Sequence, residues 1–174
     1  LTLTAADKDK AGFQSIFNGK DLAGWAGPVE NYEVVDGAIV CKKGKGGTIY
    51  TKEEYGDFVV RLEFKVPPGG NNGLAIRYPG TGNAAYDGMT ELQIIDENYY
   101  ANRKQPEKKL DPRQQHGSVY GMVPGITGYQ RPLGEWNFQE VTVKGSTIKV
   151  ELNGTVILDA DVSKVDMTTV ADKK

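Results

Sequence analysis

The sequence predicts an all-β fold, either a sandwich or a barrel, and three observations support this prediction. Glycine is abundant, with 22 in 174 residues. Long helical periodicities are absent, and short runs of alternating apolar residues recur between turns that contain Gly, Asn and Asp. Closely spaced strands of this kind are typical of antiparallel β-sandwiches and β-barrels. The length fits one domain, which we place at residues 13–163 between tails at 1–12 and 164–174.

The strands follow from the alternation of apolar side chains and from the turns between them. Asp36-Gly37 separates two apolar runs and predicts a hairpin of strands 32–35 and 38–41. The clearest strand covers 57–66, where every second residue is apolar. Further strands are expected over 48–51, 71–78 and 116–121, around the stretch 88–96, and in a final meander over 138–144, 147–152 and 156–158. Residues 98–115 are polar and irregular, which suits a functional loop.

Charge and composition exclude several classes of function. The formal net charge of −2 and the pI near 5.5 argue against a nucleic-acid or anionic-membrane partner. No apolar run is long enough to predict a membrane span. Cys41 is the single cysteine, so no internal disulfide forms, and its apolar run predicts a buried small hydrophobe. The first residue is Leu1, so we expect a chain from which any signal peptide has been removed.

The stretch from Gly88 to Asp96 combines a strand pattern with acid groups. Glu91 and Gln93 alternate with apolar residues, so their side chains point to the same face, roughly 7 Å apart. A bulge after Gln93 would bring Asp96 onto that face, and without a bulge Asp96 points the other way. Paired carboxylates suit acid–base chemistry on sugars, whereas the alternative is a strand face that is simply solvated.

Other candidate residues each allow a functional and a structural interpretation. Arg77 would hold a substrate oxygen or a carboxylate, or would form a structural ion pair. His116, the single histidine, would serve as acid, base or hydrogen-bond donor, or as an ordinary loop residue. Tyr99, Tyr120 and Trp136 suit sugar stacking as well as packing. One histidine argues against a histidine-based zinc site, and no cofactor is required. Calcium remains compatible with the oxygen ligands present, although no calcium-loop pattern occurs.

Several motifs together resemble the 3-keto-disaccharide hydrolase family over about residues 13–162. The motifs are Phe17-Asn18-Gly19-Lys20-Asp21-Leu22 with Gly24-Trp25, Asn72-Gly73-Leu74-Ala75-Ile76-Arg77, Glu91-Leu92-Gln93-Ile94-Ile95-Asp96, Gly117-Ser118-Val119-Tyr120-Gly121 and Gly134-Glu135-Trp136-Asn137. The resemblance implies a concanavalin A-like jelly roll, in which two antiparallel sheets form a sandwich with a concave sugar-binding face. It also implies a carbohydrate substrate and export to the periplasm or the cell surface.

The same resemblance implies roles for individual residues. The stretch from Glu91 to Asp96 parallels the Glu-x-Asp-x-x-Glu signature of jelly-roll glucanases, where the two glutamates are nucleophile and acid/base. This chain departs from that signature at Gln93 and at the shorter Asp96, and retaining chemistry needs carboxyl groups about 5–5.5 Å apart.

A sugar with a ketone at C3 does not need two carboxyl groups at that spacing, because the ketone acidifies the C2 proton and allows the C1 oxygen to leave by elimination. The resemblance then implies Glu91 as base, Asp96 or His116 as acid, and Arg77 with Gln93 as donors. From their aromatic rings, rather than from the resemblance, we expect Tyr99, Tyr120 and Trp136 to contact the sugar.

Two other classes of function fit a jelly roll, since a fold does not fix a function. A carbohydrate-binding module would bind sugar without cleaving it, and its affinity would survive removal of Glu91 and Asp96. A structural or adhesion domain would need aromatic residues but no desolvated acid. The sequence leaves the sugar, its linkage and the oligomeric state open.

Overall fold

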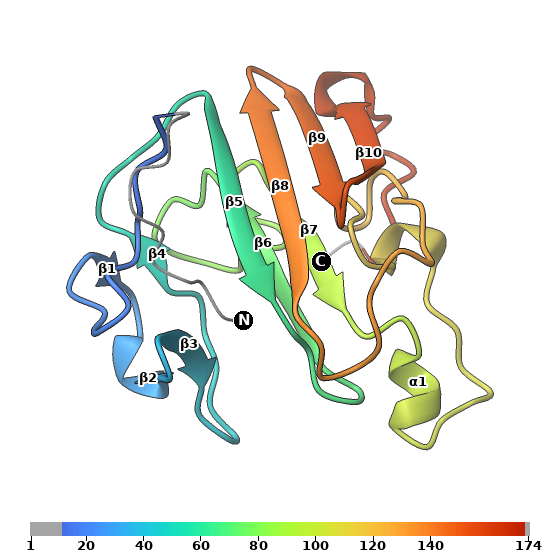
Figure 1. Ribbon diagram of the computed structural model, residues 1–174. Coiled ribbons are helices and arrows are strands. Elements are labelled where there is room, and N and C mark those ends of the chain that lie inside the picture. The colour runs from blue at the N-terminus through green and yellow to red at the C-terminus, as the bar shows by residue number, and fades with distance from the viewer. Residues whose placement is uncertain (1–11, 173–174) are drawn as a thin grey trace.

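The computed structural model describes residues 12–172 and shows an antiparallel β-sandwich (Figure 1). One layer is a four-stranded sheet with the order β10-β9-β8-β5. Its strands are β5 (Phe58–Phe64), β8 (Asn137–Lys144), β9 (Thr147–Leu152) and β10 (Thr155–Asp161). The predicted jelly-roll type of sandwich is confirmed. The predicted N-terminal tail lies, except for Gly12, outside the described residues.

The four-stranded sheet joins a local meander to a distant strand. Tight turns connect β8 to β9 and β9 to β10, as predicted, and Asn153-Gly154 in the second turn has the positive φ angles that such turns require. β5 pairs with β8 in an unbroken antiparallel register, from Phe58 opposite Val143 to Phe64 opposite Asn137. This pairing brings two parts of the chain together that are far apart in the sequence.

The second layer contains β6 (Asn71–Ile76) and β7 (Thr90–Ile95), paired in antiparallel register without a shift. The segment 117–120 runs along the free side of β7. There the Tyr120 amide donates to the Glu91 carbonyl at 2.9 Å, and the Gln93 amide donates to the Ser118 carbonyl at 3.0 Å. The predicted strand over 116–121 is therefore wrong as a regular strand, because the segment forms only isolated bridges at Val119. It nevertheless extends the β6–β7 layer.

Smaller elements flank the two layers. The predicted hairpin is confirmed as β2 (Tyr32–Val35) and β3 (Ala38–Cys41), and β1 (Trp25–Ala26) pairs with β4 (Tyr50–Thr51). The irregular stretch over 98–115 contains one short helix, α1 (Tyr99–Asn102), and the 3-10 turn η2 (Pro112–Gln114). Two further 3-10 turns are η1 (Val29–Asn31) and η3 (Val162–Lys164). Among the described residues, no helix has the length and apolar character needed to cross a membrane.

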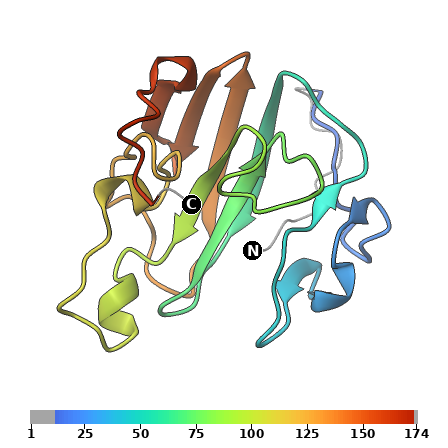
Figure 2. The same ribbon diagram turned by 180° about the vertical axis from the view of Figure 1, so that it is seen from behind.

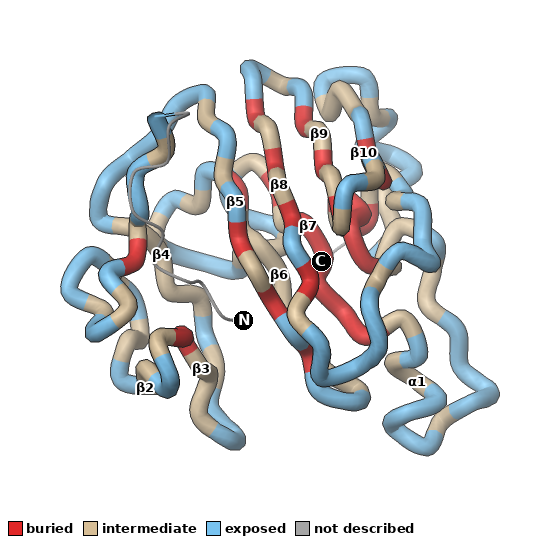
Figure 3. Tube along the Cα trace, viewed as in Figure 1, coloured by how far each residue is buried: buried red, intermediate tan, exposed pale blue. Residues whose placement is uncertain are grey.

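The core lies between the two layers, and the strands β5, β7, β8 and β9 supply much of it (Figure 3). Leu62 and Phe64 of β5 pack with Leu92 and Ile94 of β7, and all four are at most 3% exposed. The alternation predicted for β5 is confirmed, since Arg61 points away from this core. Burial of each such side chain contributes about 1.5–3 kcal/mol, so the faces that carry them fix the orientation of both strands.

The chain after β10 differs from the predicted tail over residues 164–172. Arg113 donates from Nη1 to the Thr169 carbonyl at 2.6 Å, and the Ala171 amide donates to the Gly121 carbonyl at 2.8 Å. These bonds hold the segment 166–172 against the loop that follows η2. Viewed from behind, the chain after β10 returns toward β7 (Figure 2).

His116 belongs to the core rather than to an exposed loop. It is 1% exposed, and its ring lies 5.2 Å from that of Phe64. Neither imidazole nitrogen makes a well-formed hydrogen bond within residues 12–172, and the same holds for the fully buried amide of Gln139. Burial lowers the pKa of His116 to about 4, although the Gln139 amide opposes the shift. The residue is therefore neutral in the folded protein at neutral pH, and it is not placed to serve as an acid.

We predict that His116 makes folding stability depend on pH. The unfolded chain binds a proton at this residue near pH 6.5, whereas the folded chain binds it near pH 4. The contribution of neutral His116 to the free energy of unfolding is fully present above pH 6.5. It falls by roughly 3 kcal/mol as the pH is lowered to 4. Urea unfolding between pH 7 and pH 4 should show this loss in the wild type and lack it in His116→Gln. Parallel stability curves for the two proteins would contradict the prediction.

Candidate functional site

A cleft of about 350 Å³ lies on the face of β6 and β7 that points away from the core. Strand alternation explains its position, because Leu92 and Ile94 of β7 face the core while Glu91 and Gln93 face the other way. The loop between β6 and β7 and the segment 166–172 border the same face. Nine residues line the cleft: Asn71, Asn72, Asn83, Ala85, Tyr86, Glu91, Gln93, Tyr120 and Asp172.

Glu91 lies over Gly73, and this contact sets the position of its carboxyl group. A Cβ atom at Gly73 would lie 1.6 Å from Glu91 Oε1 and 2.3 Å from its Cδ. Only glycine leaves this space, since any other residue would displace the carboxyl group. Because the carboxyl group lies against Gly73, it is partly removed from solvent, and this desolvation raises the pKa of Glu91. A carboxylate with a raised pKa is a stronger base, which suits proton abstraction from carbon.

Amide groups surround Glu91 and offer both donors and acceptors. Gln93 is 3% exposed and donates from Nε2 to the Gln114 carbonyl at 3.3 Å. Asn72 accepts from the Gly73 amide at 2.7 Å, which fixes the orientation of its side chain. Asn71 and Asn83 lie on the rim and are exposed. Carboxamides of this kind match the hydroxyl groups of a sugar, which donate and accept at the same atom.

A pair of tyrosines and one aspartate close the other side of the cleft. The hydroxyls of Tyr86 and Tyr120 donate to the same oxygen, Oδ2 of Asp172, at 2.9 and 3.0 Å. The two rings meet edge to face with their centroids 6.3 Å apart. Burial, followed by the bond to Asp172, raises the pKa of Tyr86, and burial also raises the pKa of Tyr120. Both phenols therefore keep their protons at neutral pH.

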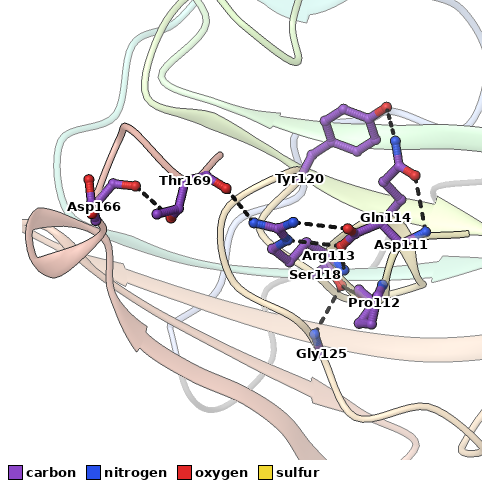
Figure 4. A network of polar contacts seen from close by, with 9 residues as sticks. All are labelled: Asp111, Pro112, Arg113, Gln114, Ser118, Tyr120, Gly125, Asp166 and Thr169. Carbon is purple, nitrogen blue, oxygen red and sulfur yellow. Dashed lines mark hydrogen bonds and ion pairs between the residues drawn. The ribbon is translucent and has the colours of Figure 1, made fainter. Parts of the chain in front are cut away.

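A polar network behind Tyr120 fixes its ring (Figure 4). Gln114 donates from Nε2 to the Tyr120 hydroxyl at 3.2 Å, and its Oε1 accepts from the Asp111 amide at 3.2 Å. Arg113 holds both oxygens of Asp111 at 2.9 Å, and these hydrogen bonds lower the pKa of Asp111 to about 2. Because Arg113 also binds the Thr169 carbonyl, one network orients Tyr120 and the segment 166–172 together.

The cleft is acidic and polar. The described residues that line it include two carboxylates and no lysine, arginine or histidine. Such a lining repels uronic acids and phosphorylated sugars, because their charge has no basic partner there. Within residues 12–172, no group of three or more His, Cys, Asp and Glu is placed to hold a metal ion.

Asp96 does not reach the cleft. The β6–β7 register shows no bulge, and β7 ends at Ile95. Asp96 is 1% exposed, and its carboxylate accepts hydrogen bonds from the Gly69 amide, the Asn98 amide and the Asn102 side chain at 2.7–2.8 Å. These bonds join the turn before β6 to both ends of the short helix α1. The structure therefore gives Asp96 a structural role in place of the acid/base role implied by the glucanase signature.

The other candidate residues also lie outside the cleft. Arg77 follows β6 and binds the Gly145 carbonyl at 2.8 Å, the Gly56 carbonyl at 3.1 Å and Asp57 at 3.2 Å. Tyr99 packs edge to face against its neighbour Tyr100 in α1. Trp136 lies under Lys65, whose Nζ is 4.6 Å from the ring centroid, at the end of the β5–β8 pair. These residues tie loops together or cover the sheet.

Of the predicted site residues, the structure brings Glu91, Gln93 and Tyr120 together. The predicted site residues did not include the other six that line the cleft: Asn71, Asn72, Asn83, Ala85, Tyr86 and Asp172. Asn71 had a usable signal, because it alternates with Gly73 on the cleft face of β6. Tyr86 and Asp172 come from segments without periodicity, so no local pattern connects them with β7.

Known proteins show similarity to this chain along most of its length. The model of a 3-keto-alpha-glucoside-1,2-lyase-like domain matches residues 12–172. A 3-keto-disaccharide hydrolase of Bacteroides thetaiotaomicron is 27% identical over 87% of this chain, which spans 59% of that protein. Two crystal structures from Parabacteroides distasonis, provisionally assigned as glycosyl hydrolases, are each 29% identical. They give TM-scores of 0.71 and 0.74, with 83% and 92% of this chain covered and 70% and 77% of theirs.

We predict that Gly73→Ala moves the Glu91 carboxyl out of its position without unfolding the sandwich, because the new methyl group would overlap it. The raised pKa of Glu91 should then return toward that of the denatured chain. Carbon-13 NMR titration of the glutamate carboxyls, native and in urea, measures the change. Gly46→Ala is the control, since a Cβ atom there meets nothing within 4 Å. An unchanged Glu91 titration in Gly73→Ala would count against the prediction.

We predict that Asp96→Asn lowers stability and leaves the cleft intact. The amide cannot accept all three hydrogen bonds, so the loss should be about 1–3 kcal/mol. Urea unfolding measures the stability, and the NMR titration of Glu91 reports on the cleft. A changed Glu91 titration at unchanged stability would restore a role for Asp96 in the site.

Proposed function

The chain belongs to the 3-keto-alpha-glucoside-1,2-lyase-like family, and on that premise we propose that its cleft cleaves the glycosidic bond of a 3-keto-glucoside or a related 3-keto sugar. The observation that carries this proposal is Glu91, a covered carboxylate with a raised pKa on the polar face of β7. A single well-placed base is what elimination from a 3-keto sugar requires. The whole protein's activity is part of the proposal, since the chain spans 59% of its curated relative.

In the proposed reaction, Glu91 takes the proton from C2, which the ketone at C3 acidifies. The electron pair of the C2–H bond passes first into an enolate at the C3 ketone, and then a C1=C2 double bond forms as the C1–O bond breaks. Water then adds across the double bond, so that the sum of both steps is hydrolysis. The leaving oxygen needs a proton, and we assign this to Glu91, which returns the proton that it took from C2. Asp96 and His116 are unsuitable donors, because they lie outside the cleft.

The rest of the lining supports a neutral sugar as the substrate. Gln93 and Asn72 offer amide donors and acceptors near Glu91, and no basic residue lines the described part of the cleft. Uncharged hydroxyl groups can satisfy such amides, whereas an anionic sugar would meet two carboxylates.

The test is release of the second sugar or aglycone from a panel of glucosides and their 3-keto forms. We predict that the wild type cleaves the 3-keto forms alone and that Glu91→Gln lowers kcat by at least about 10²-fold, because general-base catalysis is lost. In the wild type, kcat/KM should fall on the acidic side with a midpoint above that of an ordinary glutamate. Glu33→Gln, on the exposed side of β2, is the matched control.

Other outcomes point elsewhere. Cleavage of plain glucosides at a similar rate would favour a glucanase mechanism. Full turnover by Glu91→Gln would remove Glu91 as the base. Saturable sugar binding without cleavage would identify a carbohydrate-binding module.

A further inference from the structure

We propose that the hydroxyls of Tyr86 and Tyr120 form a two-donor site for the enolate oxygen of the reaction, and that the Asp172 carboxylate holds the place of that oxygen. The inference rests on the proposed function and names the groups that receive the developing charge. Two O–H donors converge on one atom, Asp172 Oδ2, at 2.9 and 3.0 Å. Convergence of two donors on one anionic oxygen is the arrangement that stabilises oxyanions in enzymes.

The location of this pair beside the base supports the assignment. Tyr120 lies opposite Glu91, because its amide donates to the Glu91 carbonyl and their neighbours Val119 and Leu92 form an antiparallel bridge. Both side chains line the same cleft. A sugar carries its C2 proton and its C3 oxygen on adjacent carbons. A base and a pair of donors on neighbouring chain segments therefore suit the two reacting positions, the C2 proton that is removed and the C3 oxygen that gains charge.

The chemistry gives the pair a defined task. When Glu91 removes the C2 proton, the electron pair forms a C2=C3 bond, and the negative charge moves to the C3 oxygen. The two phenols donate to that oxygen and keep their own protons. The charge then returns, the ketone forms again, and the C1–O bond breaks as C1=C2 forms. Each donor is bonded more strongly in the charged state than in the ketone, so its effect falls on kcat.

Asp172 competes with the sugar for these donors. The segment that carries it is fixed at the Thr169 carbonyl by Arg113 and at the Ala171 amide by Gly121. Its carboxylate lines the same cleft as Glu91. A sugar oxygen that enters the site must displace this carboxylate. Asp172 is thus an internal competitor, and its removal should tighten sugar binding.

The first test needs no turnover and uses acetate as the probe. In Asp172→Ala, acetate should shift the carbon-13 ring signals of Tyr86 and Tyr120, because the donors can accept an external carboxylate. The shift should vanish in Asp172→Ala combined with Tyr120→Phe. The wild type and Asp159→Ala, a control at an exposed position of β10, should not respond over the same acetate range. Unresponsive rings in Asp172→Ala would overturn the two-donor site, and an equal response in the wild type would overturn the competitor role.

The second test is kinetic and uses the 3-keto-glucoside. Tyr86→Phe and Tyr120→Phe should each lower kcat by about 10²-fold, as loss of one oxyanion donor does elsewhere. Asp172→Ala should lower KM several-fold and retain kcat. A rise in KM at constant kcat in the tyrosine variants would show a ground-state contact and contradict the assignment. A wild type that leaves the 3-keto-glucoside intact would remove the proposed function alone, since the acetate titration is independent of cleavage.

Discussion

The two-residue repeat of β7 is the constraint on which the rest of the structure depends. Leu92 and Ile94 are fully buried between the sheets, and this burial fixes which way the strand faces. A shift by one residue would move them into the cleft and Glu91 into the core, where an unpaired carboxylate is costly. The burial that stabilises the sandwich therefore also fixes the position of the Glu91 carboxyl in the cleft. β6 follows this constraint, because Gly73 must lie where Glu91 needs space.

The side chains that line the cleft are held in place by three different kinds of interaction. Glu91 and Gln93 are placed by a strand, and their geometry follows from backbone hydrogen bonds on both sides of it. Tyr120 is placed by a network of side chains that begins at Asp111 and Arg113. Asp172 is placed by bonds from a segment outside both sheets. Glu91 and Gln93 are thus held by a regular strand, whereas Asp172 is held by a few hydrogen bonds of the segment 166–172.

Sequence patterns predicted the strands well, because the burial of alternate residues is a local property. The same logic found Glu91 and Gln93. It left the direction of Asp96 open, because that depends on a bulge that the ladder lacks, and it did not predict the burial of His116, which depends on a distant strand that carries Gln139. Arg77 and Trp136 carry chemistry suited to sugars but are used for loop and sheet contacts. Contacts between distant parts of the chain determine where these four side chains lie, and neither the spacing nor the type of the residues predicts such contacts.

The pairing of β5 with β8 also bears on how the protein assembles. Phe64 at the end of β5 lies opposite Asn137 at the start of β8. Residues 65–136 therefore form one long connection that leaves the four-stranded sheet after β5 and returns to it at the adjacent strand β8. Among the described residues that line the cleft, all except Asp172 belong to this connection. Contacts of such long separation slow folding, because the loop must close before its contacts form. The connection also carries Leu92 and Ile94 of the core, so its closure assembles the cleft and one layer of the sandwich together.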